Sequence, residues 1–519
     1  MTIETTKTRE QSLTELPRKA TRKEWLGLAV LGMTSLVVAI DLFVMLLALP
    51  KISQDLHASG TQLLWITDMY GFLLAGFLIT MGTLGDHIGR RKVLLLGSAA
   101  FGATSFLVAF SQSAEMLIFA RALLGVAGAM IAPAALSLIR HMFADPEENA
   151  RAISIWLSCL IGGSIVGPLV GGVLLEHFWW GSVFLVGIPP MVIALLGGRK
   201  FLPEYKNPDA AQLHFPSVFL SLAAILSLIY GMTEVAAYGW QVLPVVALLV
   251  GMVLSVVFVC QQRTLPDPLL DVTLFKKPAF TLMLVAMLMN TMFPGGVMVL
   301  STQYLQLVAG LSPLQAGLWM IPAMLASILG FQVSPSLART IRPAYLIALG
   351  LVCSIIGLLI LCLTNVGGDL VALLIGFALF NLGSGPLVTL GTGIVIGSVA
   401  PQKAGAAAAV SQTGNEFGFA LGVAVVGSIG AFVYRMQTTT LPHELSADAT
   451  HAVQETLATA VSTAGNLPGK LGSDVLSIAR NAFVQEYHTV ALLSAGVLAI
   501  IAVVIVVMLK NLPAMAEKN

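Results

Sequence analysis

Four ionisable side chains lie inside long apolar stretches of this 519-residue sequence: Asp41, Asp68, Arg121 and Glu416. A charge at the centre of a lipid bilayer costs at least about 2.5–3.5 kcal/mol, so such residues are functional candidates by default. Burial favours the neutral form of a carboxyl group, which allows an acid to hold a proton near neutral pH. Because a lipophilic cation competes for the same carboxylate, these residues predict exchange of protons for a cation. The alternative for each is a structural ion pair or hydrogen bond.

A site for an organic cation also needs aromatic faces and adaptable walls. Residues close to the candidate acids supply both, and we predict that they line a substrate cavity: Trp65, Tyr70, Gln412, Asn415 and Phe417. The chain has 21 methionines, whose flexible side chains suit a wall that repacks around varied ligands. Each of these residues taken alone is more often a packing residue, and that alternative remains open.

The composition indicates what kind of molecule positions these groups. Hydrophobic residues make up 57% of the chain and charged residues 10%, whereas a soluble domain has about 45–50% and 25%. These values exclude an ordinary soluble protein, and they exclude a disordered chain, which needs low hydrophobicity. The net charge of +1 gives no indication of nucleic-acid binding. The remaining class is an all-α polytopic membrane protein.

Apolar runs long enough to span a bilayer, about 20 residues, recur along the whole chain. We count fourteen, centred near residues 37, 72, 102, 126, 163, 191, 225, 251, 289, 323, 353, 384, 418 and 498. Lys and Arg concentrate in cytoplasmic loops. With the N-terminal tail inside, most of the 27 Lys and Arg residues fall on the cytoplasmic side, so both termini are predicted to be cytoplasmic.

The sequence also contains an internal repeat. The loop Gly82–Lys92 after the second span has a degenerate copy, Ser334–Pro343, after the tenth, and the glycine-rich fifth span matches the thirteenth. Internal repeats are typical of secondary transporters. We predict six-helix bundles at 25–200 and 278–510, two inserted helices and linkers within 201–277, and cytoplasmic tails at 1–24 and 511–519. A periplasmic loop at about 435–486 is expected to form short amphipathic helices or a hairpin, as either a spacer or a gate.

The loop after the second span combines tight turns with charges: Gly82, Asp86, Gly89, Arg90 and Arg91. Glycine lets the backbone turn sharply and approach a neighbouring helix. We expect Asp86 to pair with an arginine on an adjacent helix end, and Arg90 to bind a carboxylate or a helix C-terminus. Such a latch would hold one conformation of a transporter. The alternative is a positively charged cytoplasmic anchor with a tight turn.

The fifth span places small residues and a proline at helical spacing: Gly163, Gly167, Pro168, Gly171 and Gly172. Small residues allow helices to approach closely within a membrane, and an internal proline can bend the helix. We predict a tight, pliable seam between the two halves of the protein. Generic helix packing is the alternative.

Together these features resemble the major facilitator superfamily and, within it, the fourteen-helix drug:proton antiporters (DHA2). The motifs that carry the resemblance are Asp41-x7-Leu49-Pro50, the Gly82–Lys92 loop, Arg121-x3-Gly125-x2-Gly128, and Gly163–Gly172. The sequence is most similar to the QacA-like and SmvA-like branch, which exports quaternary ammonium compounds and methyl viologen. The resemblance implies a monomer in the bacterial inner membrane that couples cation export to protons through Asp41, Asp68, Glu416 and Arg121. It also implies a gating role for the loop motif.

Other chemistry lacks support in the sequence. No phosphate-binding loop, nucleophile elbow or metal-ligand pattern is present, so we expect no cofactor, no metal, no ATP and no enzymatic activity. The four cysteines are expected to be packed as small apolar residues. Ser327 stands near the place where some relatives that handle divalent cations carry an acid, which argues against efficient export of divalent cations. An exporter of an endogenous metabolite, siderophore or peptide remains the alternative function.

Overall fold

The computed structural model describes residues 19–206, 214–238, 240–265, 268, 272–367, 369–399, 404–442 and 444–509. All regular structure in this part of the chain is helical. Thirteen of its helices are long and apolar enough to cross a membrane, or fourteen when the helix α3 (Gly60–Ile88), which bends by 50° at residue 79, counts as one span. The prediction of an all-α polytopic membrane protein is confirmed, and each predicted span centre lies in its own helix.

The helices fall into two long series and a pair between them. The first series contains α2 (Arg22–Asp55), α3, α4 (Arg90–Ala109), α5 (Ala114–Met142), α6 (Pro146–His177), the single turn α7 (Ser182–Leu185) and α8 (Ile188–Phe201). The pair consists of α9 (Phe215–Tyr238) and α10 (Val242–Thr264). After a 3-10 turn at Val272–Lys276, the second series contains α11 (Pro278–Gln303), α12 (Pro313–Leu337), α13 (Pro343–Leu361), α14 (Leu370–Gly397), α15 (Ala404–Gln437) and α18 (Gly469–Leu509).

Helix starts reveal the internal repeat at the local level. The helix α3 begins after Ser59, whose side chain caps the helix together with Gln62. Its counterpart α12 begins after Ser312, which forms the same reciprocal cap with Gln315. Such a capping box satisfies two of the backbone N–H groups that a helix N-terminus leaves unpaired. The same local signal therefore starts the second helix of each series.

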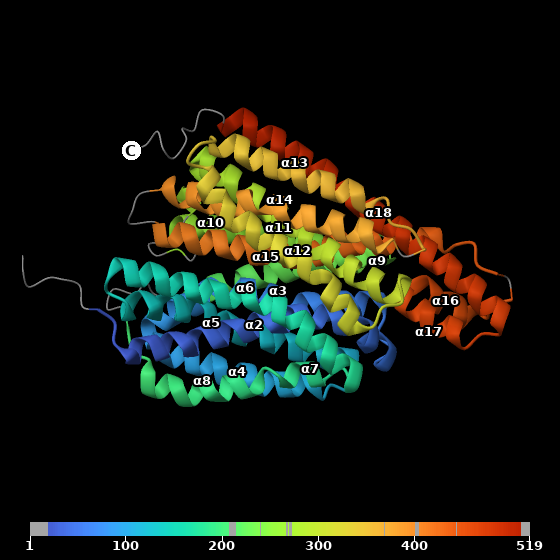
Figure 1. The fold of residues 1–519 in the computed structure, drawn as a ribbon, viewed down its shortest axis with the longest axis horizontal. Helices are drawn as coiled ribbons and strands as arrows, with labels where there is room; N and C mark the ends of the chain where they lie inside the picture. The colour runs from blue at the N-terminus through green and yellow to red at the C-terminus, as the bar shows by residue number, and fades with distance from the viewer. Residues whose placement is uncertain are drawn as a thin grey trace, which may run out of the picture.

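Helix packing repeats the same symmetry in three dimensions. In the first series α2 packs on α6, α3 on α5 and α4 on α8. In the second series the counterparts pair identically: α11 on α15, α12 on α14 and α13 on α18. The two series lie one below the other in Figure 1 and meet through α3 with α15 and α6 with α12. These two contacts are themselves equivalent under the repeat.

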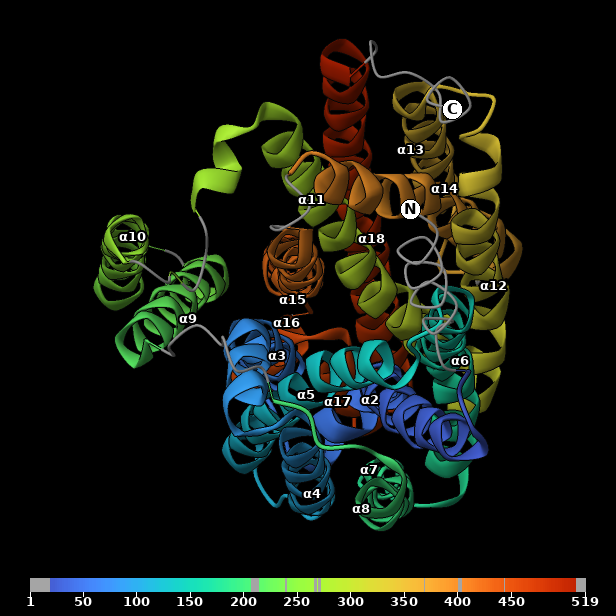
Figure 2. The ribbon, with the colours of Figure 1, turned by 90° about the vertical axis from the view of Figure 1, so that its left-hand side faces the viewer.

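The inserted pair lies to one side of this arrangement (Figure 2). The helix α9 packs against both α3 and α15, whereas α10 packs mainly on α9. Large apolar side chains on α10 are exposed, including Trp240, Val253 and Val256 near or within the helix. In a membrane this surface faces lipid. Cys260 is exposed on α10, so the expectation that all four cysteines are packed is wrong for this one, because α10 has a neighbour on one side only.

The segment expected to form the long outer loop is mostly helical. Two short helices, α16 (Ala447–Glu455) and α17 (Leu457–Gly465), are followed by α18, which begins at Gly469 and runs for 41 residues. The expected end of the loop at Glu486 is therefore too late. In Figure 1, α16 and α17 lie at the end of the molecule opposite to that where α2 begins and α18 ends.

Candidate functional site

Two of the predicted residues form a buried ion pair between α2 and α5. The Nη1 atom of Arg121 donates to Oδ2 of Asp41 at 2.7 Å, and the two side chains are 0% and 5% exposed. The Nε atom of Arg121 donates to the backbone oxygen of Ile66 on α3 at 3.2 Å. One arginine thus links three helices, and the pair carries no net charge.

An aromatic ring covers this pair. The guanidinium of Arg121 lies 4.5 Å from the ring centroid of Tyr70, within the range of a cation–π contact. Asp41, Arg121 and Glu416 all lie within electrostatic reach of the Tyr70 hydroxyl. That hydroxyl is buried and has no hydrogen-bond partner among the described residues. Tyr70 therefore covers the ion pair of the first series and leaves a polar hydroxyl unsatisfied beside it.

Asp68 differs from Asp41 because it forms no ion pair with any of the described residues. It lies on α3, two residues before Tyr70, and is 2% exposed. Its Oδ1 atom is buried without a hydrogen-bond partner in the described part of the chain. A buried charge without compensation is strongly unfavourable, so this carboxyl requires a proton or a cation. Asp68 is thus the predicted acid for which the described residues supply the least compensation.

The fourth predicted residue is placed by α15. Glu416 accepts a hydrogen bond from Nε2 of Gln412, one turn away, at 2.9 Å. The Oδ1 atom of Asn415 is buried without a partner in the described residues. A run of residues on α15 therefore presents a carboxyl group and unsatisfied polar atoms next to α3, on which α15 packs.

Two of the predicted cavity residues pack against a small apolar cluster. Phe417 lies 6.1 Å from the ring of Phe72, and Trp65 lies 6.1 Å from the ring of Tyr230 on α9, measured between centroids. Trp65 and Phe417 both pack around Phe72 together with Ile229 of α9. The structure thus places them at the contact of α3, α9 and α15, where they join the inserted pair to both series.

The charged loop between α3 and α4 forms a latch within the first series. Asp86, in the last turn of α3, accepts from Nε of Arg90 at 2.9 Å, and Arg90 is the first residue of α4, so its partner is an arginine at the end of an adjacent helix. The two side chains lie close because Gly89 alone separates the end of α3 from the start of α4. Arg91 donates from Nη1 to the backbone oxygen of Leu202 at 3.1 Å and pairs with Glu204 at 3.5 Å.

Glycines allow this loop to pack closely. Gly89 has φ +115°, a conformation that other residues rarely adopt, and a Cβ there would collide with Glu204. At Gly82 a Cβ would make an ordinary contact with Pro133 of α5, at 3.7 Å, so the packing there does not require glycine. The backbone N–H of Arg90 also donates to the oxygen of Tyr205 at 2.9 Å. All these partners belong to the first series or to the segment that follows it.

The glycine motif of α6 is divided between two neighbours. Three of its glycines face α2: a Cβ on Gly163 would lie 2.7 Å from the oxygen of Leu36, and Gly167 and Gly171 approach the next two turns of α2. Two positions instead meet α12 of the second series. A Cβ on Gly172 would lie 2.5 Å from the Cα of Leu314. A Cβ on Gly317 of α12 would likewise lie 2.5 Å from the backbone oxygen of Pro168. The expected seam between the halves therefore rests on Pro168 and Gly172.

Substitution of Gly172 tests this seam. We expect Gly172→Ala to force α6 and α12 apart, because the three nearest atoms that its Cβ would meet all belong to the backbone of α12, and to cost about 1–3 kcal/mol. The measurement is the apparent melting temperature in detergent, which should fall. Gly496→Ala on α18 is the matched control, since nothing lies within 4 Å of its Cβ. Equal melting temperatures for the two variants would contradict a tight seam at Gly172.

One buried acid was missed by the sequence interpretation. Glu486 was assigned to the end of the outer loop, but it is buried on α18. A signal was available: Val475, Ala479, Phe483 and Tyr487 are apolar at helical spacing, and all four are buried. Among the described residues no group of three or more His, Cys, Asp and Glu side chains could hold a metal ion.

Comparison with known proteins identifies the family of this chain. The model of the Major Facilitator Superfamily matches residues 31–423. The chain is 39% identical to the multidrug efflux pump LfrA of Mycolicibacterium smegmatis, covering 95% of this chain and 97% of the relative. It is 33% identical to the methyl viologen resistance protein SmvA of Salmonella typhimurium, covering 91% and 96%. It is 29% identical to the tetracenomycin C resistance and export protein of Streptomyces glaucescens, covering 92% and 90%.

A solved structure shows the same fold at much lower identity. It is a bacterial homologue of the human lysosomal transporter Spinster in an inward-facing, unoccupied conformation, with a TM-score of 0.69 and 15% identity over 95% of this chain and 98% of that chain. The helix count, the fold, the family match and the relatives together confirm the resemblance drawn from the motifs. The chain belongs to the major facilitator superfamily, as a multi-pass transporter of the bacterial inner membrane and not as an enzyme.

Proposed function

We propose that this transporter exports drugs and biocides that are lipophilic cations, such as quaternary ammonium compounds, cationic dyes and methyl viologen, in exchange for protons. Two relatives that match over nearly the whole chain support drug efflux, since one is a multidrug efflux pump and the other confers methyl viologen resistance. The observation that carries the preference for cations is Asp68, a buried acid with an oxygen that has no partner among the described residues.

The charge balance of the membrane interior supports this preference. Asp41 is neutralised by Arg121, whereas Asp68 and Glu416 have no ion-pair partner within the described residues. Arg121 is the one buried Lys or Arg side chain in the described part of the chain. An anionic metabolite would need a free buried cation, and Arg121 is already occupied by Asp41. The site is therefore better suited to a cation than to an anion.

A competition between proton and drug follows from this balance. A lipophilic cation that enters from the cytoplasm displaces the proton held by Asp68 or Glu416, and a proton from outside later displaces the cation. The membrane potential supplies about 2.3 kcal/mol per charge per 100 mV. This direction requires both termini to be cytoplasmic and α16 and α17 to be periplasmic, as the distribution of Lys and Arg predicts.

Contacts between the two series hold the outer end together in the conformation from which we expect the cycle to start. At the outer end, Nε2 of Gln306 donates to the oxygen of Leu47 at 3.3 Å, and Gly172 packs on Leu314. These contacts join α2 and α6 to the second series beneath α16 and α17. Export requires them to separate while the cytoplasmic end closes. The latch of Asp86, Arg90 and Arg91 keeps the first series rigid during this movement.

Dye transport tests the proposal. Ethidium uptake into everted vesicles should collapse when a protonophore is added, and Glu416→Gln should slow it about tenfold, the effect of losing ~1.4 kcal/mol of cation binding. Glu444→Gln, which changes an exposed acid in the outer segment, should transport as the wild type does. Uptake that is insensitive to the protonophore would refute proton coupling, and equal uptake of an anionic dye would refute the cation preference.

A further inference from the structure

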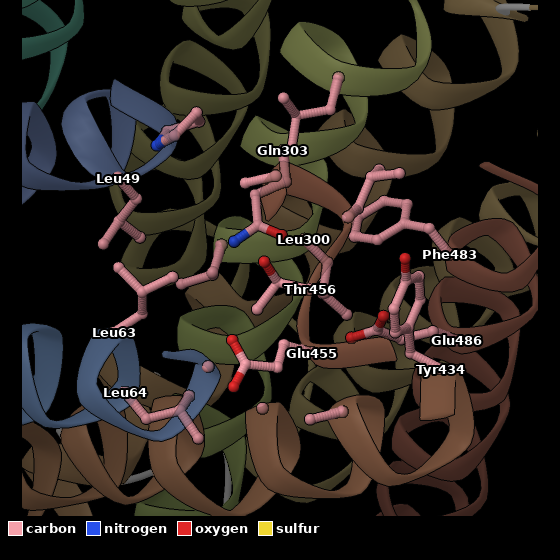
Figure 3. A pocket seen from close by; sticks show the side chains of 18 of the residues that line it. Leu49, Leu63, Leu64, Leu300, Gln303, Tyr434, Glu455, Thr456, Phe483 and Glu486 are labelled. Atoms are coloured by element: carbon pink, nitrogen blue, oxygen red, sulfur yellow. The ribbon is translucent and has the colours of Figure 1, made fainter. Parts of the chain in front are cut away.

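A cavity that does not include Asp68 or Glu416 lies at the outer end of the molecule. It has a volume of about 80 Å³, and one water needs only about 10–15 Å³ on this scale. Helices of both series form its walls, and the start of α17 covers it. Figure 3 shows Leu49, Leu63 and Leu64 on one side and Tyr434 and Glu486 on the other.

Glu486 is the distinctive residue of this cavity. It is 7% exposed, lines the cavity, and has no hydrogen bond or ion pair within the described residues. A Cβ on Gly430 of α15 would collide with its Oε1 atom, so the glycine leaves room for the carboxyl group. The neighbouring Tyr434 hydroxyl does not satisfy it, because it donates to the backbone oxygen of Val453 on α16 at 3.0 Å.

The other polar groups that line the cavity are acidic or neutral. Glu455, at the end of α16, also lines it, and its side chain is 26% exposed and 3.6 Å from Nδ1 of His451. Gln303 and Thr456 contribute neutral polar atoms, and no Lys or Arg is among the described residues that line the cavity. Acids and leucines together provide a countercharge and an apolar wall, which a lipophilic cation requires.

The cavity lies along the path from the candidate transport site to the outside. Leu64 and Thr67 of α3 line it, and Asp68 is the next residue of the same helix. Four residues of helix separate Leu64 from Asp68 by about 6 Å. A cation that leaves Asp68 toward the outer end therefore meets this cavity first.

We propose that this cavity is an exit site, in which Glu486 binds the ammonium group of the exported cation before release. The inference rests on the proposed export of cations, and it adds a binding site beyond the four residues Asp41, Asp68, Arg121 and Glu416. Release then requires α16 and α17 to move, because the Tyr434–Val453 hydrogen bond and the contact of Thr456 with Gly60 hold the cover in place.

Thiol labelling tests the charge preference of the cavity without any transport measurement. In a variant without native cysteines, Leu64→Cys places a thiol in the wall. The probes are the trimethylammonium-ethyl and the sulfonato-ethyl methanethiosulfonates, which differ in charge. We expect the cationic reagent to react about tenfold faster than the anionic one, and Glu486→Gln to remove most of this ratio. Glu486→Asp, which keeps the charge, should retain it.

Thr440→Cys provides the matched control, because this residue is exposed in the outer segment and does not line the cavity. Its ratio of reaction rates should not change with Glu486→Gln. A Leu64→Cys thiol that reacts equally with both reagents, or with neither, would overturn the proposal. A ratio at Leu64→Cys that Glu486→Gln leaves unchanged would overturn it as well.

Transport by the same variants separates the two proposals. Ethidium efflux by Glu486→Gln should be about tenfold slower than in the wild type, while ethidium still binds to the purified variant with unchanged affinity at the inner site. If the wild-type chain exports no cation but the labelling ratio holds, the proposed function fails and the cation site stands. If export is normal in Glu486→Gln, the exit site is refuted and the proposed function stands.

Discussion

Asp68→Asn is expected to abolish ethidium export while leaving the protein folded. Asparagine has the same shape but neither binds a proton nor balances a cation, so the export rate should fall about a hundredfold, the effect of losing ~2.8 kcal/mol. The fold should persist because the native carboxyl group has an oxygen without a partner among the described residues, so its replacement by an amide leaves no charged partner uncompensated there. Efflux from cells and the apparent melting temperature in detergent measure the two effects separately.

The control for Asp68→Asn is the same substitution at an exposed aspartate. Asp474→Asn changes an exposed residue in the first turns of α18, and we expect wild-type export from it. Asp68→Glu keeps the charge and should retain part of the activity. Wild-type export by Asp68→Asn would remove the observation on which the preference for cations depends.

Arg121→Met is expected to cause the largest loss of stability. It removes the guanidinium that neutralises Asp41, and it leaves that carboxyl group buried without a partner. Breaking a buried pair on one side costs about 3–5 kcal/mol, mainly because the remaining charge is uncompensated. The melting temperature and the yield of folded protein should both fall sharply relative to the wild type.

A double variant separates the charge from the packing. In Asp41→Asn with Arg121→Met, no uncompensated charge remains, so most of the lost stability should return, whereas transport should not. Arg140→Met is the matched control, since Arg140 is exposed in the last turn of the same helix α5. A double variant as unstable as Arg121→Met alone would show that the arginine acts through its contacts with Ile66 and Tyr70 and not through Asp41.

The helices and their repeat were predictable from local information. Each apolar run of membrane-spanning length became a helix, because backbone groups in lipid must be paired within the segment. The capping residues Ser59 and Ser312 can be recognised from sequence, and they start equivalent helices. The last helix was the exception. Polar residues in its first turns, such as Asp474 and Arg480, hid the apolar face that packs against α13 and α15.

The partners of the ionisable residues depended on the fold. The sequence identified Asp41, Asp68, Arg121 and Glu416 as unusual because each lies in an apolar run. It contained no information that Arg121 neutralises Asp41 and leaves Asp68 unpaired, since these residues are far apart in the chain and meet only when α2, α3 and α5 pack. Likewise, the sequence did not show that Trp65 and Phe417 pack with α9 against the apolar cluster around Phe72; their prediction as cavity residues stays a prediction.

The amino-acid sequence by itself therefore determined the class of protein, the helices, the family and the residues that carry charge into the membrane. Hydrophobicity, glycine spacing and charge are properties of short segments, so they can be assigned without knowing which helices pack together. Only the tertiary structure decided which acids are paired, which glycines of α6 face α12, and that Glu486 lines a cavity beneath α17. Those outcomes depend on helices from both series approaching within a few ångströms, which no single segment specifies.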